Sequence, residues 1–151
     1  MANEQPDMTL KAIGFVRNEI KQPIREGWEK VVSEVVVDES WTEALEGLEK
    51  FSHIIVIYWM HHLETTGALP CKVYPMGRRE LPLVGLFATR SPNRPNPLGK
   101  ATVRLLERQE NVLKVEGLDA IDGTPVIDVK PYIPGYDSVA DAKTAPWIIN
   151  Q

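Results

Sequence analysis

A short loop rich in proline, arginine and asparagine is the part of the sequence best suited to chemistry. It runs Thr89-Arg90-Ser91-Pro92-Asn93-Arg94-Pro95-Asn96-Pro97-Leu98-Gly99-Lys100. Each proline fixes its own φ and restricts the residue before it, so the loop should be stiff without being regular structure. Arg90 and Arg94 would then hold their guanidinium groups in set directions, which suits a carboxylate or a phosphate. A single Arg-Pro pair would indicate a surface turn, but this density of arginine, asparagine and proline favours a binding site.

A second stretch places an acid and a base side by side. Within residues 118–134, Asp122-Gly123 predicts a turn, and a strand should follow it. Asp128 and Lys130 lie two apart in that strand, so they share one face of it. They could form a polar pocket floor, or an ion pair that holds a barrel mouth closed. Taken alone, this pattern favours the ion pair.

The sequence does not predict a metal centre. His61 and His62 are adjacent at the end of an apolar strand-like run, so they point to opposite faces, and spacing places no third ligand. Cys71 is the only cysteine, which excludes an intrachain disulfide and a thiolate cluster. It has a basic neighbour but no identifiable general base.

The charge of the chain is unevenly distributed. The net charge is −4, yet the segment from Lys72 to Arg104 contains seven basic residues and one acid, Glu80. That segment carries +6 and the remainder −10. Such asymmetry can build an anion-attracting face on an acidic protein, or it can reflect two solvated surfaces of different sign.

The elements that would position these residues are mostly short strands. Turn-prone residues separate runs rich in valine, isoleucine, leucine and aromatic residues. These runs cover residues 12–17, 33–37, 53–60, 84–88, 102–106, 112–117 and 126–129. One helix is expected where Ser40 can act as the cap and Glu43 follows as in a capping box. Many short strands with one short helix predict an all-β protein built as a compact β-barrel, not a doubly wound nucleotide-binding sheet.

Length and composition indicate one soluble domain. With 151 residues and 43% hydrophobic residues, the chain can form one core, and we expect a single domain over residues 1–151. Its apolar runs are too short to span a bilayer, and the N-terminus does not resemble a signal peptide. The single cysteine fits a reducing, cytoplasmic setting, and we expect no membrane partner.

Taken together, these motifs resemble the TrmO family (YaeB-like, TsaA-domain) of tRNA methyltransferases over almost the whole chain. The Arg-Pro-Asn-Pro motif, followed by Asp-Gly-Thr-Pro and Lys-Pro-Tyr in this order and spacing, is highly specific. The matching segments are Ile13-Gly14-Phe15-Val16-Arg17, Phe51-Ser52-His53, residues 85–91, Arg94-Pro95-Asn96-Pro97-Leu98-Gly99, and residues 122–134.

The resemblance implies a dimeric β-barrel that binds S-adenosylmethionine outside any Rossmann framework. The family reaction is methylation of N6 in N6-threonylcarbamoyladenosine, next to the anticodon of tRNA. By motif, the implied cofactor-binding residues are Glu26, Gly27, Trp28, His61, His62, Arg90, Arg94, Lys100, Glu116, Gly117, Leu118 and Asp119. Many bacterial members carry a second, C-terminal domain, and we expect this chain to lack it.

The same resemblance gives roles to further residues. We expect Asp128 to accept or orient the N6 proton, with Lys130 and Tyr132 positioning the substrate. Arg90 or Arg94 would bind the carboxylate of the cofactor. We expect RNA phosphates to be held by Arg78, Arg79 and Arg104.

Two other functions remain open from the sequence. The chain could methylate another RNA or a small molecule, or it could be a barrel that binds cofactor or RNA without catalysis. Pairing of Asp128 with Lys130 away from the pocket would favour the non-catalytic alternative.

Overall fold

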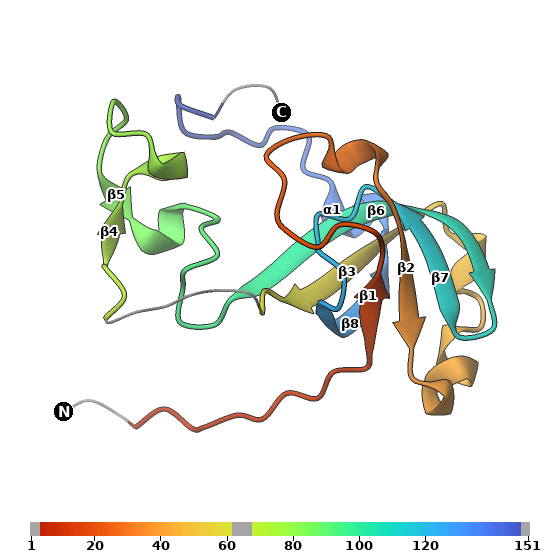
Figure 1. Cartoon of the computed structure of the whole chain (residues 1–151). Helices are drawn as coiled ribbons and strands as arrows, with labels where there is room; N and C mark the ends of the chain where they lie inside the picture. Colours follow the sequence, from red (N-terminus) through yellow and green to blue (C-terminus); the bar gives the residue numbers. More distant parts are fainter. Residues whose placement is uncertain (1–3, 62–67, 149–151) are drawn as a thin grey trace.

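The chain forms a closed, six-stranded antiparallel β-barrel, as the sequence predicts (Figure 1). The computed structural model describes residues 4–61 and 68–148. Around the barrel the strand order is β1-β2-β7-β6-β3-β8, and β8 closes against β1. The strands are β1 (Gly14–Arg17), β2 (Val32–Val37), β3 (His53–Trp59), β6 (Leu98–Gln109), β7 (Val112–Glu116) and β8 (Pro125–Pro131).

Alternating side chains fill the barrel interior. In β2 and β7 every second residue is buried, as the period of two in a strand requires. The fully buried positions are mostly β-branched or leucine, and they include Val16, Val35, Val56, Val103 and Leu113. Because a small barrel is filled by its own side chains, a ligand must bind at its rim or on its outer surface.

One irregularity decides which residues of β8 face outward. β8 pairs with β3 so that Asp128 lies opposite Ile57, and the register shifts before Val126 pairs with Tyr58. Val126 and Tyr58 both belong to the buried core. The bulge between these pairs therefore puts Asp128 on the outer side of the barrel.

An excursion between β3 and β6 leaves the barrel and builds a separate small sheet (Figure 1). It contains β4 (Lys72–Val73) paired with β5 (Val84–Gly85), and the 3-10 turns η4 (Pro75–Gly77) and η5 (Leu86–Ala88). The prediction of one strand over residues 84–88 was therefore wrong in its second half, because the chain turns at Leu86. The excursion leads directly into the Arg-Pro-Asn-Pro loop.

The predicted helix around Ser40 exists in a different form. Residues Glu39–Leu45 form a 3-10 helix, η2, whose cap is Asp38, and the Asp38 carboxylate accepts from the backbone N–H of Ser40 at 2.9 Å. The assignment of Ser40 as the cap was wrong, because Asp38 supplies the acceptor two residues earlier. The remaining turns are η1 (Trp28–Lys30), η3 (Leu48–Lys50) and a short α1 (Pro134–Asp137). In the described ranges no helix is long and apolar enough to cross a membrane.

The close contact between Gly99 and Tyr58 gives a test of the barrel packing. A Cβ at Gly99 would lie 2.3 Å from the ring of Tyr58, which is buried and held by a hydrogen bond. We expect Gly99→Ala to lower the free energy of unfolding by about 1–3 kcal/mol, because the ring cannot move aside. Urea unfolding measures this change.

Gly85→Ala is the matched control. Its φ is −62°, and an added Cβ would meet no described atom within 4 Å. Its free energy of unfolding should stay within about 0.5 kcal/mol of wild type. Equal stability of the two variants would show that the Tyr58 ring is not fixed against Gly99.

Candidate functional site

A pocket of about 190 Å³ lies at the end of the barrel where β3 finishes. Three of the residues that the sequence assigns to the cofactor line it, namely Trp28, His61 and Asp119. They come from three different loops, after β1, after β3 and after β7. The other lining residues are Pro23, Tyr58, Met60, Pro92, Ala120, Ile121 and Thr124.

A hydrogen bond between Tyr58 and Asp119 fixes the wall of this pocket. The Tyr58 hydroxyl donates to the Asp119 carboxylate at 2.5 Å, and the ring packs on Gly99 of β6. Burial raises the pKa of Tyr58 well above its ordinary value, and the Asp119 carboxylate raises it further. Tyr58 therefore remains a neutral donor, and Asp119 presents a negative charge to the pocket.

The loop that carries Trp28 is held by the turn predicted at Asp122. The backbone N–H of Asn18 donates to the Asp122 carboxylate at 2.9 Å, and the Asn18 amide donates to Ser33 Oγ and the Ala120 carbonyl, both at 2.9 Å. Lys21 Nζ contacts the same carboxylate at 2.7 Å. The Lys21 contact and the Asn18 N–H lower the pKa of Asp122. Asn18 thus ties three segments together beside the pocket.

The two neighbours of Trp28 contribute differently. Gly27 has φ 92°, which a residue with a side chain rarely adopts, and it starts the turn η1. The Trp28 indole N–H donates to the Ile24 carbonyl at 2.9 Å, so the ring is oriented within its own loop. Glu26 is exposed beside them.

Of the predicted cofactor residues 116–119, only the last, Asp119, lines the pocket. Glu116 and Gly117 are partly buried at the strand end, and Gly117 has φ 98°. The Leu118 side chain is fully buried in the core, so only its backbone could contact a ligand. Asp119 carries the exposed polar group of this segment.

Arg94 stabilises the Arg-Pro-Asn-Pro loop from within. Its Nη1 donates to the carbonyls of Thr89 at 3.0 Å and Ser91 at 3.1 Å. Its guanidinium also lies 5.7 Å from the ring centre of Phe87. These contacts direct Arg94 toward its own backbone, and they add to the restriction that the prolines place on the loop.

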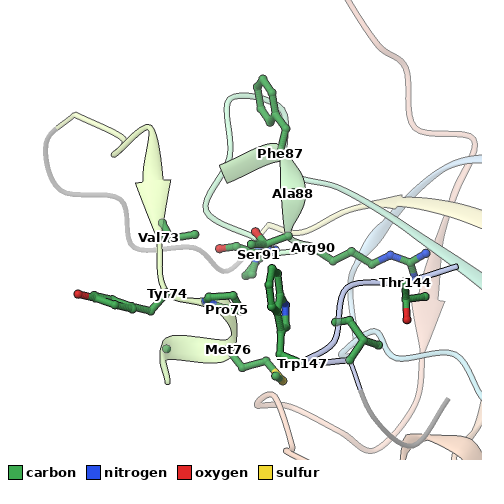
Figure 2. Close-up of a pocket in the computed structure, with 14 residues that line it drawn as sticks. Val73, Tyr74, Pro75, Met76, Phe87, Ala88, Arg90, Ser91, Thr144 and Trp147 are labelled. Carbon is green, nitrogen blue, oxygen red and sulfur yellow. Dashed lines mark hydrogen bonds between the residues drawn. The ribbon is translucent and has the colours of Figure 1, made fainter. Parts of the chain in front are cut away.

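A larger pocket of about 950 Å³ adjoins the first, and Pro92 lines both. The excursion and the C-terminal segment enclose it, and Arg90 and Trp147 are among its lining residues (Figure 2). Figure 2 shows Arg90 reaching toward Thr144 on the C-terminal segment. Arg90 thus lies at the larger pocket. Only Ser91 separates it in sequence from Pro92, which lines both pockets.

The residues expected to act in catalysis lie outside both pockets. Asp128 and Lys130 form an ion pair at 3.0 Å on the outer side of β8, where both are about half exposed. The backbone N–H of Tyr132 donates to the carbonyl of His53 at the opposite end of β3. That end is about 17 Å along the strand from Tyr58. The structure does not bring these three residues to the pocket.

The expected RNA-binding residues are also divided. Arg78 and Arg79 are exposed on the excursion, where Arg78 pairs with Glu80 at 2.7 Å and Arg79 lies 5.8 Å from the Tyr74 ring centre. Arg104 lies opposite His53 on the barrel, and Lys100 lies opposite Ile57 on its outer side. His62, the remaining residue predicted by motif, lies outside the described residues.

Sequence reasoning did not identify several residues of the two pockets. Tyr58 and Met60 were predicted only as strand residues. They lie two apart and share one face of the chain at the end of β3, and that face lines the pocket. Trp147 lies beyond the motifs, and nothing in its own surroundings in the sequence marks it. Among the described residues, no group of three or more histidine, cysteine, aspartate or glutamate side chains could hold a metal ion.

Comparison with known proteins identifies related sequences and structures. The sequence profile of the tRNA-methyltransferase O N-terminal domain matches residues 16–138. A probable S-adenosyl-L-methionine-binding protein of Archaeoglobus fulgidus is 44% identical over 138 residues, which cover 89% of this chain and 36% of that protein. The tRNA (adenine(37)-N6)-methyltransferase of Escherichia coli is 35% identical over 147 residues, which cover 90% of this chain and 62% of the enzyme.

A solved structure shows the same fold. The crystal structure of TrmO from Pseudomonas aeruginosa superposes with a TM-score of 0.75 at 30% identity. The match covers 93% of this chain and 63% of that one. This chain therefore spans between about one third and two thirds of the length of these three proteins.

The raised pKa of Tyr58 predicts how stability depends on alkaline pH. The unfolded chain releases this proton near pH 10, whereas the folded protein retains it to higher pH. Stability from this group is therefore complete below about pH 10 and falls above it, by up to about 1.4 kcal/mol per pH unit. Urea unfolding between about pH 8 and pH 11 should show a smaller decline for Tyr58→Phe than for wild type. Parallel declines would contradict the assignment.

Proposed function

The chain belongs to the tRNA-methyltransferase O N-terminal domain family, and on this basis we propose that it is an S-adenosylmethionine-dependent tRNA methyltransferase. Its proposed acceptor is N6 of N6-threonylcarbamoyladenosine next to the anticodon, and its proposed setting is the cytoplasm. One observation carries the proposal most. Trp28, His61 and Asp119, assigned to the cofactor by motif and far apart in sequence, line one pocket.

The residues of this pocket fit the chemistry of the cofactor. Trp28 and Met60 offer apolar surface for an adenine ring, and the Asp119 carboxylate can accept from hydroxyl groups or face a cation. The pocket alone is small for a cofactor, but the edge of the adjoining pocket next to Pro92 provides further room and brings in Arg90 for a carboxylate. Once bound, S-adenosylmethionine supplies a methyl group on a positively charged sulfur.

The main proposed role of these residues is to position the methyl donor and the acceptor. Methyl transfer is an in-line displacement, so holding donor and acceptor in line provides much of the rate enhancement. The Tyr58–Asp119 hydrogen bond, the Asn18 contacts and the Arg94 contacts each fix one wall segment. A stiff pocket loses little conformational entropy when a ligand binds.

We further propose that the protein is a homodimer in which the outer face of β3 meets a second copy. Ile57 and Trp59 are partly buried on that face, and Trp59 pairs with Leu98 of β6, which is 40% exposed. The Asp128–Lys130 pair lies beside this apolar stripe. In a dimer built on this face, Asp128 of one subunit would approach the pocket of the other and could accept the N6 proton there.

One observation favours a second candidate function. Asp128 and Lys130 pair with each other on the outside of their own barrel. If no second copy uses them, the protein is a barrel that binds cofactor or RNA without catalysis.

Mass spectrometry of nucleosides tests the reaction. The protein, S-adenosylmethionine and tRNA carrying threonylcarbamoyladenosine should yield a methyl gain of about 14 Da on that nucleoside, because its N6 is the proposed acceptor. tRNA without the modification is the control and should gain nothing. Cofactor binding by calorimetry without any methyl gain would select the non-catalytic function, and methylation of a different nucleoside would change the acceptor.

Mixing two inactive variants tests completion of the site by a second subunit. Asp119→Ala should weaken cofactor binding, and Asp128→Asn should lower turnover with cofactor affinity unchanged. When equal amounts are mixed and exchange, about one quarter of the sites would hold both native residues, so about one quarter of wild-type activity should return.

The matched control is Glu107→Gln. Glu107 is an exposed residue of β6 that lines neither pocket, so this variant should be fully active alone. No recovery in a mixture that gel filtration shows to be dimeric would place both carboxylates in one subunit. Full activity of Asp128→Asn alone would remove that residue from the reaction.

A further inference from the structure

The larger pocket has a lining that differs from that of the cofactor pocket. It lies between the β4–β5 excursion and the C-terminal segment, and three aromatic side chains line it: Tyr74, Phe87 and Trp147 (Figure 2). Phe87 is 74% exposed and Tyr74 is 37% exposed, although both are large and mostly apolar. Exposed aromatic faces around a hollow indicate a binding surface for a flat, partly apolar ligand.

Positive charge surrounds this pocket. Arg90 lines it, and Arg78 and Arg79 follow directly after its wall at η4. Glu80 is the only acidic residue between Lys72 and Arg104, and it forms an ion pair with Arg78. A ligand with a flat apolar part and a negative charge beside it matches this arrangement.

Trp147 is the aromatic side chain best placed to stack on such a ligand. Figure 2 shows its ring standing inside the pocket, between Met76 and Ser91. It is partly buried, so its orientation is fixed more firmly than that of the exposed Phe87. Tyr74 and Phe87 already have arginine partners, Arg79 and Arg94 respectively.

We propose that this pocket takes an unpaired nucleobase of the RNA, with the indole of Trp147 as its stacking surface. Arg79 would face a phosphate next to that base, and Arg90 is left to the carboxylate of the cofactor. Aromatic platforms beside arginines are the recurring way in which proteins hold single-stranded nucleic acid. Because Pro92 lines both pockets, a base held here would lie in the pocket that adjoins the proposed cofactor site. The inference rests on the proposed function, since it presupposes an RNA acceptor.

RNA binding without cofactor tests the proposal independently of activity. The probe is a labelled RNA hairpin with the anticodon-loop sequence, and a closed duplex of the same composition is its partner. Trp147→Ala should weaken hairpin binding by about 5- to 150-fold, the range for loss of one base stacked on an aromatic ring. Trp147→Phe should retain most of the affinity, because phenylalanine keeps a stacking face. Calorimetry should give the same S-adenosylmethionine affinity for all three proteins.

Trp41→Ala is the matched control. Trp41 is 54% exposed in η2 and lines neither pocket, so its loss should leave hairpin affinity unchanged. Duplex affinity should be the same for wild type and Trp147→Ala, because a paired base cannot enter the pocket.

The possible failures can be told apart. Equal hairpin affinity of Trp147→Ala and wild type would overturn the pocket assignment and leave the proposed function standing. Stacking would be overturned if Trp147→Ala lost affinity for the duplex as well as for the hairpin. It would also be overturned if Trp147→Phe bound the hairpin as weakly as Trp147→Ala does. A wild-type protein that binds S-adenosylmethionine but not the hairpin would overturn the RNA acceptor itself.

Discussion

The structure depends on one constraint: a six-stranded barrel of this size is filled by its own side chains. Val16, Val35, Val56, Val103 and Leu113 occupy the interior completely, which leaves no room there for a ligand. A ligand must therefore bind at the rim or on the outer surface, and both pockets are lined mostly by segments that the barrel does not hold by strand pairing. Such segments lose conformational entropy on binding unless they are already ordered. The rim of this protein is ordered by a separate device in each segment.

These devices use polar contacts where the barrel uses apolar packing. Asn18 joins the loop of Trp28 to β2 and to the segment of residues 120–122. Arg94 bonds to carbonyls of its own loop, and Tyr58 joins β3 to Asp119. The contacts of Asn18 and Arg94 fix the backbone, whereas the Tyr58–Asp119 hydrogen bond also fixes the position of a charged side chain. Because the Tyr58 hydroxyl stays protonated, its bond leaves Asp119 as a fixed anion. A fixed anion suits a cationic ligand at the pocket, and the same preorganisation favours in-line transfer.

The sequence was sufficient to predict the barrel because alternation and turn residues are local signals. It also predicted that Asp128 and Lys130 share a face, and that Asp122-Gly123 makes a turn. It could not predict which face of the barrel Asp128 occupies, because that depends on the bulge opposite Ile57 and Tyr58, a property of the pairing between strands. Trp147 was missed for a related reason. Its position against the excursion is a contact between segments about 60 residues apart, which no local pattern encodes.

Asp119 lies in the pocket and Asp128 lies on the outer face of the barrel, and this separation affects the proposed chemistry. The pocket of one subunit offers Asp119, which is engaged by Tyr58 and so suited to hold charge more than to move a proton. The N6 of the proposed acceptor belongs to a urea-like group, which would need its proton removed or hydrogen-bonded before it could attack. The paired Asp128 is a carboxylate on an outward-facing strand beside an apolar stripe. If a second copy packs against that stripe, as proposed, assembly and proton transfer would depend on one surface.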